Sequence, residues 1–467
     1  MSEDLWKLSA LELGRRIANG DTTSVAVVDA HLDRIEAVNS KVNAITAVQA
    51  ERALIAAAAA DERHRAGRAR SALDGVPFTT KENLDCVGAA TTEGVRALAQ
   101  NVVDTDAPVV ERLRSAGAVP LARTNMPDFG LRIHTDNALH GPTINPWSAD
   151  HTSGGSSGGE GVALATGMSP MGIGNDIGGS VRNPAFCSGV VSHKPTPHRL
   201  PRASVTPPTS WGPAKQLMSV NGPMARRVTD LQAMFALLHG RHRRDPWSVT
   251  TPFSTVQAPG RVKVVGIVPG VETDPEITAG VWAAAGALAA AGWQVEEASP
   301  PMVEEASTAW LQWLGGEISL RRSTIEGVMS DDAVRFLDHA EVLSGEGTLE
   351  RTIDALTTRH GAASAWHEFL ADGAVLLAPV WAQPPFRLGT DVDSLEGARS
   401  VMDRLRLVVV ANVLGLPATN VPVGVDSRGL PMGVQLFASQ HADDRSLAAA
   451  AAVEASIGGL TPIDPRF

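Results

Sequence analysis

Apolar residues recur at every third or fourth position over residues 24–60, which is the spacing of one helix face. The members of this face are Val28, His31, Leu32, Ile35 and Val38. An alanine-rich run follows them, and the hydroxyl of Thr23 or Ser24 suits the N-cap position. The pattern therefore predicts helical structure throughout this segment.

Short apolar runs alternate with helical patterns in the rest of the N-terminal half. Residues 68–80 contain a turn followed by a strand, and a helix over 105–117 ends at a glycine. A short strand is expected over 118–122 and a further helix over 224–239.

The C-terminal half shows the alternation of an α/β protein. A strand over 262–268, a helix over 275–290 and a strand over 293–297 follow one another. Residues 302–370 are mostly helical, and residues 374–380 form an apolar run typical of a buried strand.

Residues 405–456 complete the pattern with a helix, a strand, a hairpin and a last helix. The segments 200–215 and 245–260 are rich in Pro, Ser and Thr and are expected to be surface loops. Because neither an internal repeat nor a clean linker is apparent, we predict one domain over residues 1–467.

The composition excludes several functional classes. Of the 467 residues, 43% are hydrophobic and 19% charged, which suits a large buried core. With 40 Lys and Arg against 51 Asp and Glu, the net charge of −11 disfavours a nucleic-acid partner. Cys86 and Cys187 are too few for a disulfide framework or a zinc site, so no metal is expected.

The longest weakly charged stretches, 279–293 and 407–415, are shorter than the roughly 20 apolar residues that span a bilayer. The first residues, MSEDLWKLSA, lack the basic and apolar parts of a secretory signal. The sequence therefore predicts no integral membrane segment and a cytoplasmic location.

Lysine is rare in this chain. It occurs only at positions 7, 41, 81, 194, 215 and 263, and arginine supplies the remaining basic residues. Unlike arginine, a buried lysine can lose its proton. A lysine that persists against this bias is thus a candidate for proton-transfer chemistry. Tyrosine is absent, so no Tyr acid or base is available.

Three segments carry candidate chemistry. In 75–83, Lys81 directly follows an apolar strand; in 153–159, four glycines surround serines and allow an otherwise strained backbone path. In 174–182, small residues before Ser180 allow several N–H groups to converge on one point, as in an oxyanion hole. Taken alone, each segment also fits a structural role: a solvated lysine, a flexible turn and a strand-to-helix turn.

Two other motifs match only formally. The glycines of 172–178 resemble a dinucleotide-binding loop, but no acidic residue follows near 190–200 to bind a ribose. Gly154-x-Ser156-x-Gly158 matches a nucleophile elbow, but the preceding residues 145–153 are loop-like rather than an apolar strand.

Together the three segments resemble the amidase signature family. The block from Gly154 to Thr196 matches the family's glycine- and serine-rich core, and separations of 75 residues from Lys81 to Ser156 and 24 to Ser180 suit it. The resemblance covers most of the chain. The residues of the glycine- and serine-rich block are most similar to the fatty acid amide hydrolase type. It implies a three-layer α/β/α sandwich with a mixed central sheet, whose signature core spans 68–240.

The resemblance also implies the roles of the site residues. Ser180 is the expected nucleophile, and Ser156, on a cis peptide in this family, bridges it to Lys81. A serine needs an adjacent base, and a lysine can act as one only if its pKa falls by several units from about 10.4. The expected oxyanion donors are the N–H groups of Ile177, Gly178, Gly179 and Ser180.

Further residues match supporting positions of the family: Ser157, Asp176 and Arg182. Leu131 and Ile133 lie in the segment that aligns with the acyl pocket of the fatty acid amide hydrolase type, and they would suit an apolar acyl or aryl group. Trp310, Trp313 and Trp381 could belong to a lid or to the pocket, but core packing is the expected role of each.

The resulting prediction is a cofactor-free hydrolase that cleaves a linear amide through a serine acyl-enzyme and releases a carboxylic acid and an amine or ammonia. Its partners would be a small amide substrate and, by resemblance, a second copy of the chain. Alternatives are a glutaminase subunit of an amidotransferase, which needs a partner chain, an esterase or aryl acylamidase activity at the same site, and an inactive scaffold. The scaffold is disfavoured because Lys81, Ser156 and Ser180 are all present.

Overall fold

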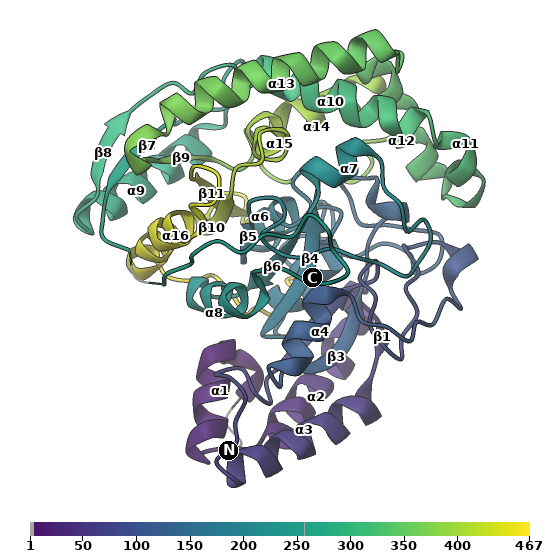
Figure 1. The fold of residues 1–467 in the computed structure, drawn as a ribbon, viewed down its shortest axis with the longest axis vertical. Coiled ribbons are helices and arrows are strands. Elements are labelled where there is room, and N and C mark those ends of the chain that lie inside the picture. Colours follow the sequence, from purple (N-terminus) through teal and green to yellow (C-terminus); the bar gives the residue numbers. More distant parts are fainter. Residues whose placement is uncertain (1–3, 256) are drawn as a thin grey trace.

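One mixed sheet of eleven strands organises the chain (Figure 1). The computed structural model describes residues 4–255 and 257–467. The strands are β1 (Ile45–Val48), β2 (Pro77–Lys81), β3 (Val119–Thr124), β4 (Met171–Asp176), β5 (Val191–Lys194), β6 (Val220–Ala225), β7 (Arg261–Val264), β8 (Gln294–Glu297), β9 (Val375–Pro379), β10 (Ala418–Val425) and β11 (Pro431–Phe437). Their order is β1-β3-β2-β4-β6-β5-β10-β11-β9-β7-β8.

The sheet combines parallel and antiparallel pairing. β2 pairs in parallel with β3 and β4, and β7 pairs in parallel with β8 and β9. The strands from β4 through β6, β5, β10 and β11 to β9 pair antiparallel. The predicted mixed sheet is confirmed. Because β2 and β4 are parallel neighbours, their carboxyl ends meet at one edge of the sheet.

Helices cover both faces of the sheet. They are α1 (Ala10–Asn19), α2 (Ser24–Val42), α3 (Ala50–Arg65), α4 (Pro108–Ser115), α5 (Gly158–Ala165), α6 (Arg182–Ser188), α7 (Pro213–Met218), α8 (Val228–Leu238), α9 (Pro275–Ala290), α10 (Val303–Ser319), α11 (Arg322–Ile325), α12 (Asp331–Ser344), α13 (Leu349–Phe369), α14 (Leu395–Arg404), α15 (Arg406–Val413) and α16 (Asp443–Ile457).

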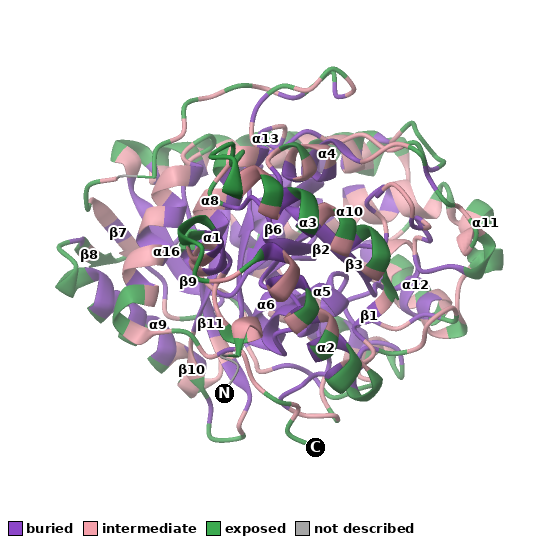
Figure 2. Ribbon diagram, turned by 90° about the horizontal axis from the view of Figure 1, so that it is seen from below, coloured by how far each residue is buried: buried purple, intermediate pink, exposed green. Residues whose placement is uncertain are grey.

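The buried apolar side chains form separate clusters around the sheet. One unites α1, α4, α8, α9 and α16; a second unites α10, α12, α13 and α15; a third joins α2, α3 and α5 to β3. In Figure 2 the buried strands lie between helices whose outer faces are exposed. The α/β/α layering expected from the resemblance is confirmed.

The helical structure predicted over 24–60 is confirmed for most of the segment, but residues 43–49 interrupt it. α2 ends at Val42, Asn43 takes the left-handed conformation with φ 50°, and β1 intervenes before α3. The Asn39 side chain accepts hydrogen bonds from the N–H groups of Ala44 and Ile45, which turns the chain into β1. Asparagine is among the few residues that adopt this conformation at low cost. The predicted cap is present, since Thr23 Oγ1 accepts from the Ala26 N–H at 3.1 Å.

Other predictions match closely. The helix over 275–290 is α9, and the apolar run 374–380 contains β9, whose five residues are all buried. The predicted strand over 262–268 is shorter, because β7 ends at Val264. The helical region 302–370 divides into α10, α11, α12 and α13. These helices lie at the end of the molecule opposite α1 and α3 (Figure 1).

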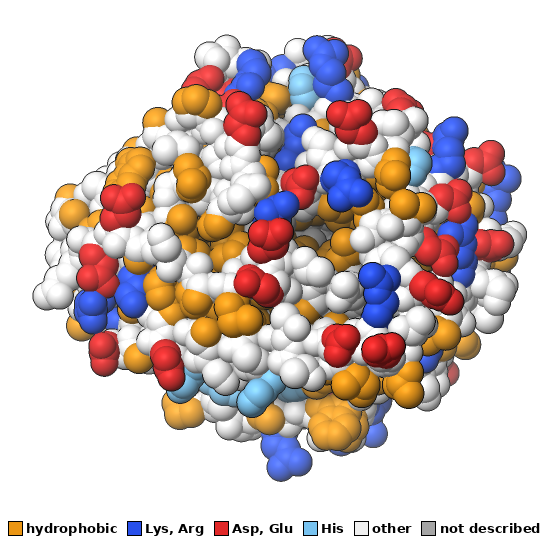
Figure 3. Space-filling view, turned by 90° about the horizontal axis from the view of Figure 1, so that it is seen from above, with side chains coloured by type: hydrophobic (Ala, Val, Ile, Leu, Met, Phe, Trp, Pro, Cys, Tyr) orange, Lys and Arg blue, Asp and Glu red, His pale blue; other side chains and the backbone are white. Residues whose placement is uncertain are grey.

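Figure 3 shows the face of the molecule that carries α10, α12 and α13. Hydrophobic side chains gather near its centre beside a hollow, and acidic and basic side chains are interspersed around them. Among residues 4–255 and 257–467, no helix combines the length and apolar character needed to cross a membrane.

Candidate active site

Lys81 is the last residue of β2 and is fully buried. Its Nζ donates a hydrogen bond to Ser156 Oγ at 2.6 Å and another to Asn175 Oδ1 at 2.8 Å. Asn175 reaches it because β4 lies beside β2 in the sheet. Burial lowers the pKa of Lys81 to about 7, so a large fraction of this amine is neutral near neutral pH. The first and second candidate segments are therefore in direct contact.

Ser156 lies on a cis peptide bond with Gly155, in the loop before α5. Glycine is required at 155, since a Cβ there would lie 2.6 Å from the backbone of Arg132 and Ile133. The next residue links this loop to the third segment: the Ser157 N–H donates to the Ser180 carbonyl at 3.1 Å. All three candidate segments thus converge.

The Asp176 carboxylate organises the loop that leads to Ser180. It accepts hydrogen bonds from the N–H groups of Gly179 at 2.8 Å and Val181 at 3.2 Å, and from Arg182 at 3.1 Å. Burial alone would raise the pKa of Asp176, but the Arg182 guanidinium outweighs it and lowers this pKa to about 2. Asp176 and Arg182 therefore support the loop, as the resemblance implies for these positions.

The backbone N–H groups of this loop differ in their partners. Because the Gly179 N–H is bonded to Asp176, it is not a free donor, which corrects the expectation for this residue. For the N–H groups of Ile177, Gly178 and Ser180, no acceptor is found among the described residues. Three of the four expected oxyanion donors therefore have no acceptor within residues 4–255 and 257–467.

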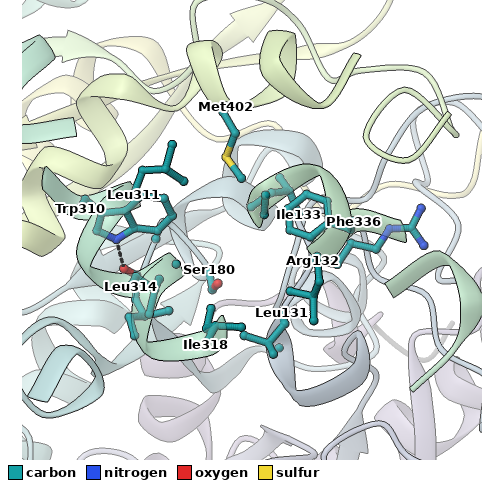
Figure 4. Close-up of a pocket in the computed structure, with 16 residues that line it drawn as sticks. Leu131, Arg132, Ile133, Ser180, Trp310, Leu311, Leu314, Ile318, Phe336 and Met402 are labelled. Carbon is teal, nitrogen blue, oxygen red and sulfur yellow. Dashed lines mark hydrogen bonds between the residues drawn. The ribbon is translucent and has the colours of Figure 1, made fainter. Parts of the chain in front are cut away.

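Ser180 lies at an apolar pocket (Figure 4). Leu131 and Ile133, predicted as substrate contacts, both line it. Further lining side chains come from the helices α10, α12 and α14: Trp310, Leu311, Leu314, Ile318, Phe336, Leu337, Ala340 and Met402. In Figure 4 the labelled side chains of α10, α12 and α14 lie around the Ser180 hydroxyl. The site thus joins a polar, buried centre to a hydrophobic compartment.

The segment that contributes Leu131 and Ile133 is held by ion pairs and caps. Arg132 pairs with the buried Asp391 through Nε at 2.7 Å, and its side chain is 2% exposed. Asp128 accepts from the backbone N–H and the hydroxyl of Ser330, the N-cap residue of α12. These contacts therefore hold this wall of the pocket against the start of α12 and the loop before α14.

Sequence reasoning missed one polar side chain of the site. Asn175 stands beside Asp176 in the quoted motif, but its contact with Lys81 depends on strand pairing that only the fold reveals. Trp310 is buried in the core, which is the role expected for it, and it also lines the pocket. The core assignment holds for Trp313 and Trp381, which are 3% and 0% exposed. Among the described residues, no group of three His, Cys, Asp or Glu side chains could hold a metal ion.

The comparisons with known proteins agree with this geometry. The model of the Amidase family matches residues 26–447. An indoleacetamide hydrolase from Bradyrhizobium diazoefficiens is 37% identical over 98% of this chain and 88% of its own length. One subunit of the glutamyl-tRNA(Gln) amidotransferase from Salinispora tropica is 31% identical over 98% of this chain and 99% of its own.

A solved structure of 6-aminohexanoate cyclic dimer hydrolase in complex with its substrate superposes with a TM-score of 0.83. It is 28% identical, and the match covers 99% of both chains. The family model and these relatives span nearly the whole chain, not only its glycine-rich core. The chain therefore belongs to the amidase family and is an amide-hydrolysing enzyme.

Proposed function

We propose that this enzyme hydrolyses a linear amide with an apolar acyl group of aryl or arylalkyl type, with Ser180 as nucleophile, Ser156 as proton bridge and Lys81 as base. The observation that carries the proposal is the 2.6 Å hydrogen bond between Lys81 Nζ and Ser156 Oγ, buried beneath an apolar pocket lined by Ser180. A lysine with a pKa of about 7 suits a general base near neutral pH.

The chemistry then runs in two balanced steps. Ser180 Oγ attacks the carbonyl carbon, its proton passes to Ser156 Oγ, and the Ser156 proton passes to neutral Lys81 Nζ. The same path returns a proton to the leaving nitrogen as the C–N bond breaks, which releases an amine or ammonia and leaves an ester on Ser180. Water hydrolyses this ester by the same route, and the carboxylic acid leaves.

Charge on the tetrahedral oxygen would be held by backbone donors. We assign this role to the N–H groups of Ile177, Gly178 and Ser180, since the Gly179 N–H is bonded to Asp176. One oxyanion donor is typically worth about 10²- to 10³-fold in rate. Ser157 supports the arrangement because its N–H donates to the Ser180 carbonyl.

The pocket favours an apolar acyl group. Its walls are mainly Leu, Ile, Phe, Met and Trp side chains, and the charge of Arg132 is neutralised by Asp391. Burying a polar acyl group there would cost free energy, whereas an aryl ring gains from desolvation. The name of the 37% identical relative, indoleacetamide hydrolase, makes indole-3-acetamide the first substrate to test.

The test is hydrolysis by the purified chain of indole-3-acetamide, phenylacetamide and glutamine, beside a Ser180→Ala variant. We expect turnover of the aryl amides and a loss of at least about 10⁴-fold in the variant. Glutamine hydrolysis that needs an added partner chain would favour the amidotransferase alternative. Aryl-amide turnover that persists in Ser180→Ala would contradict the assignment of the nucleophile.

Three further expectations belong to this proposal. We treat residues 1–467 as one amidase domain with its signature core in 68–240, which the single eleven-stranded sheet supports. A homodimer is proposed from the family resemblance, and light scattering of the purified protein tests it. A cytoplasmic location is proposed from two buried, unpaired cysteines, and cell fractionation tests it.

A further inference from the structure

Trp310 connects the helices over the pocket to the loop before Ser180. It lies on α10 and is 6% exposed. Its indole Nε1–H donates to the Ile177 carbonyl at 2.8 Å, the contact drawn in Figure 4. Its ring packs on Gly178, where a Cβ would lie 2.4 Å from Trp310 Cζ2. A residue more than a hundred positions away in the chain therefore fixes one peptide of this loop.

The bond to the Ile177 carbonyl also fixes an N–H group. The peptide between Ile177 and Gly178 is not among the cis bonds of the described chain, so its C=O and N–H point in opposite directions. Holding the carbonyl on the indole therefore aims the Gly178 N–H away from Trp310. This N–H has no acceptor among the described residues, and Gly178 lines the pocket.

The two following peptides are fixed from within the same segment. The Gly178 carbonyl accepts from Asn183 Nδ2 at 3.2 Å, and the Gly179 N–H donates to Asp176. The Gly179 carbonyl accepts from the Asn183 N–H at 2.6 Å, which aims the Ser180 N–H to the opposite side. Of these three peptides, only the first is hydrogen-bonded directly to a distant element.

We propose that Trp310 is a positioning residue of the reaction: its indole N–H holds the Ile177–Gly178 peptide so that the Gly178 N–H meets the tetrahedral oxygen formed at Ser180. This inference rests on the proposed function. The indole acts through the peptide and not on the reacting atoms, so its loss weakens stabilisation of the tetrahedral state more than binding of the substrate.

The first variant is Trp310→Phe, which keeps an aromatic ring and removes the donor. Trp313→Phe is the matched control, since Trp313 is buried on the same helix but does not line the pocket. We expect Trp310→Phe to lower kcat about tenfold or more with KM changed less than about threefold. Trp313→Phe should leave the ratio of kcat to KM close to wild type.

A second measurement distinguishes a loss of transition-state stabilisation from a change in the shape of the pocket. An arylalkyl boronic acid forms a tetrahedral adduct with a nucleophilic serine, and its inhibition constant should rise in Trp310→Phe by the same factor as kcat falls. Ground-state binding is measured as the dissociation constant of the amide in Ser180→Ala with and without Trp310→Phe. These two constants should differ less than about threefold.

Replacing Trp310 by the isosteric analogue β-(3-benzothienyl)alanine removes the N–H with the ring shape retained, and it covers the case in which Trp310→Phe does not fold. The same loss of kcat is expected. A kcat within twofold of wild type, or an equal loss in ground-state binding, overturns the inference while Ser180→Ala remains inactive. If Ser180→Ala is active, the proposed function has failed instead.

Discussion

Two buried lysines, Lys81 and Lys194, invite comparison. Both are 0% exposed, both end a strand of the central sheet, and burial lowers the pKa of each to about 7. Their contacts differ. Lys81 Nζ donates to Ser156 Oγ, whereas Lys194 Nζ donates to the Pro195 carbonyl at 2.9 Å. A hydroxyl can pass a proton onward, but a backbone carbonyl cannot.

The difference shows that a lowered pKa does not by itself identify a base. Burial is the main cause of the lowered pKa both in a structural lysine and in one placed for proton transfer. The two lysines differ in whether a hydrogen-bonded hydroxyl can relay a proton between the amine and the pocket. Lys81 has such a relay through Ser156, whereas Lys194 lies among the structural ion pairs of Asp176 and Asp443.

The largest expected effect comes from removing each lysine in turn. Lys81→Met should lower kcat about 10³-fold, since it removes the proposed general base. Lys194→Met should keep most of the activity, because its ammonium faces no hydroxyl of the site. Steady-state kinetics on an aryl amide measures both. If Lys194→Met falls as far as Lys81→Met, the distinction between the two lysines is wrong.

The second prediction concerns pH. Lys81 must be neutral to accept a proton, so kcat/KM should rise with pH and level off above about 7, the pKa to which burial lowers this amine. Below that pH it should fall about tenfold per unit. The Lys194→Met variant should show the same acid limb. An acid limb that moves in this variant would assign the titration to Lys194.

The third prediction concerns a variant that shifts the pH at which kcat/KM falls on the acid side. Asn175→Asp places a carboxylate where Asn175 Oδ1 now accepts from Lys81 Nζ at 2.8 Å. An adjacent negative charge favours the ammonium form, so the limb should shift about one pH unit or more to the alkaline side. Activity at pH 7 should then fall about fivefold or more and recover at higher pH. Asn175→Ser is the neutral control, and a limb that stays in place in Asn175→Asp would contradict this reasoning.

The smallest effect is on stability. The folded pKa of Lys194 lies near 7, below its unfolded value of about 10.4, so the unfolded chain binds more protons between these values. The free energy of unfolding should therefore rise with pH in this window, by at most about 1.4 kcal/mol per pH unit for one lysine. Lys194→Met should rise less steeply, because one of the buried lysines with a lowered pKa is then removed. Urea denaturation at pH 7 and pH 9 measures the difference, and equal slopes would refute it.

The sequence predicted most where local pattern and tertiary context agree. α9 and β9 have unbroken apolar runs or faces and lie within the predicted limits. The helical pattern over 24–60 did not reveal the break at residues 43–49, where the side chain of Asn39 and pairing with β3 outweigh the periodicity of apolar residues. Local spacing carries no information about either.

The candidate site divides in the same way. Lys81, Ser156 and Ser180 stand out because their motifs lie in continuous sequence. The bond between Gly179 and Asp176 depends on how individual peptides are rotated, and the place of Trp310 depends on how α10 packs over the loop. Both are set by contacts across the fold, which one sequence does not reveal.

The partners of Asp176 set a condition on synthesis. The carboxylate accepts from Asn412 Nδ2 at 2.8 Å, across 236 residues of chain, and Arg182 donates to the Val408 carbonyl. Every residue to which we assign catalysis is translated before residue 181, yet the loop lacks this support until α15 emerges from the ribosome. At about 5–20 residues per second, that interval lasts on the order of tens of seconds. The nascent chain therefore carries its catalytic side chains long before it becomes an amidase.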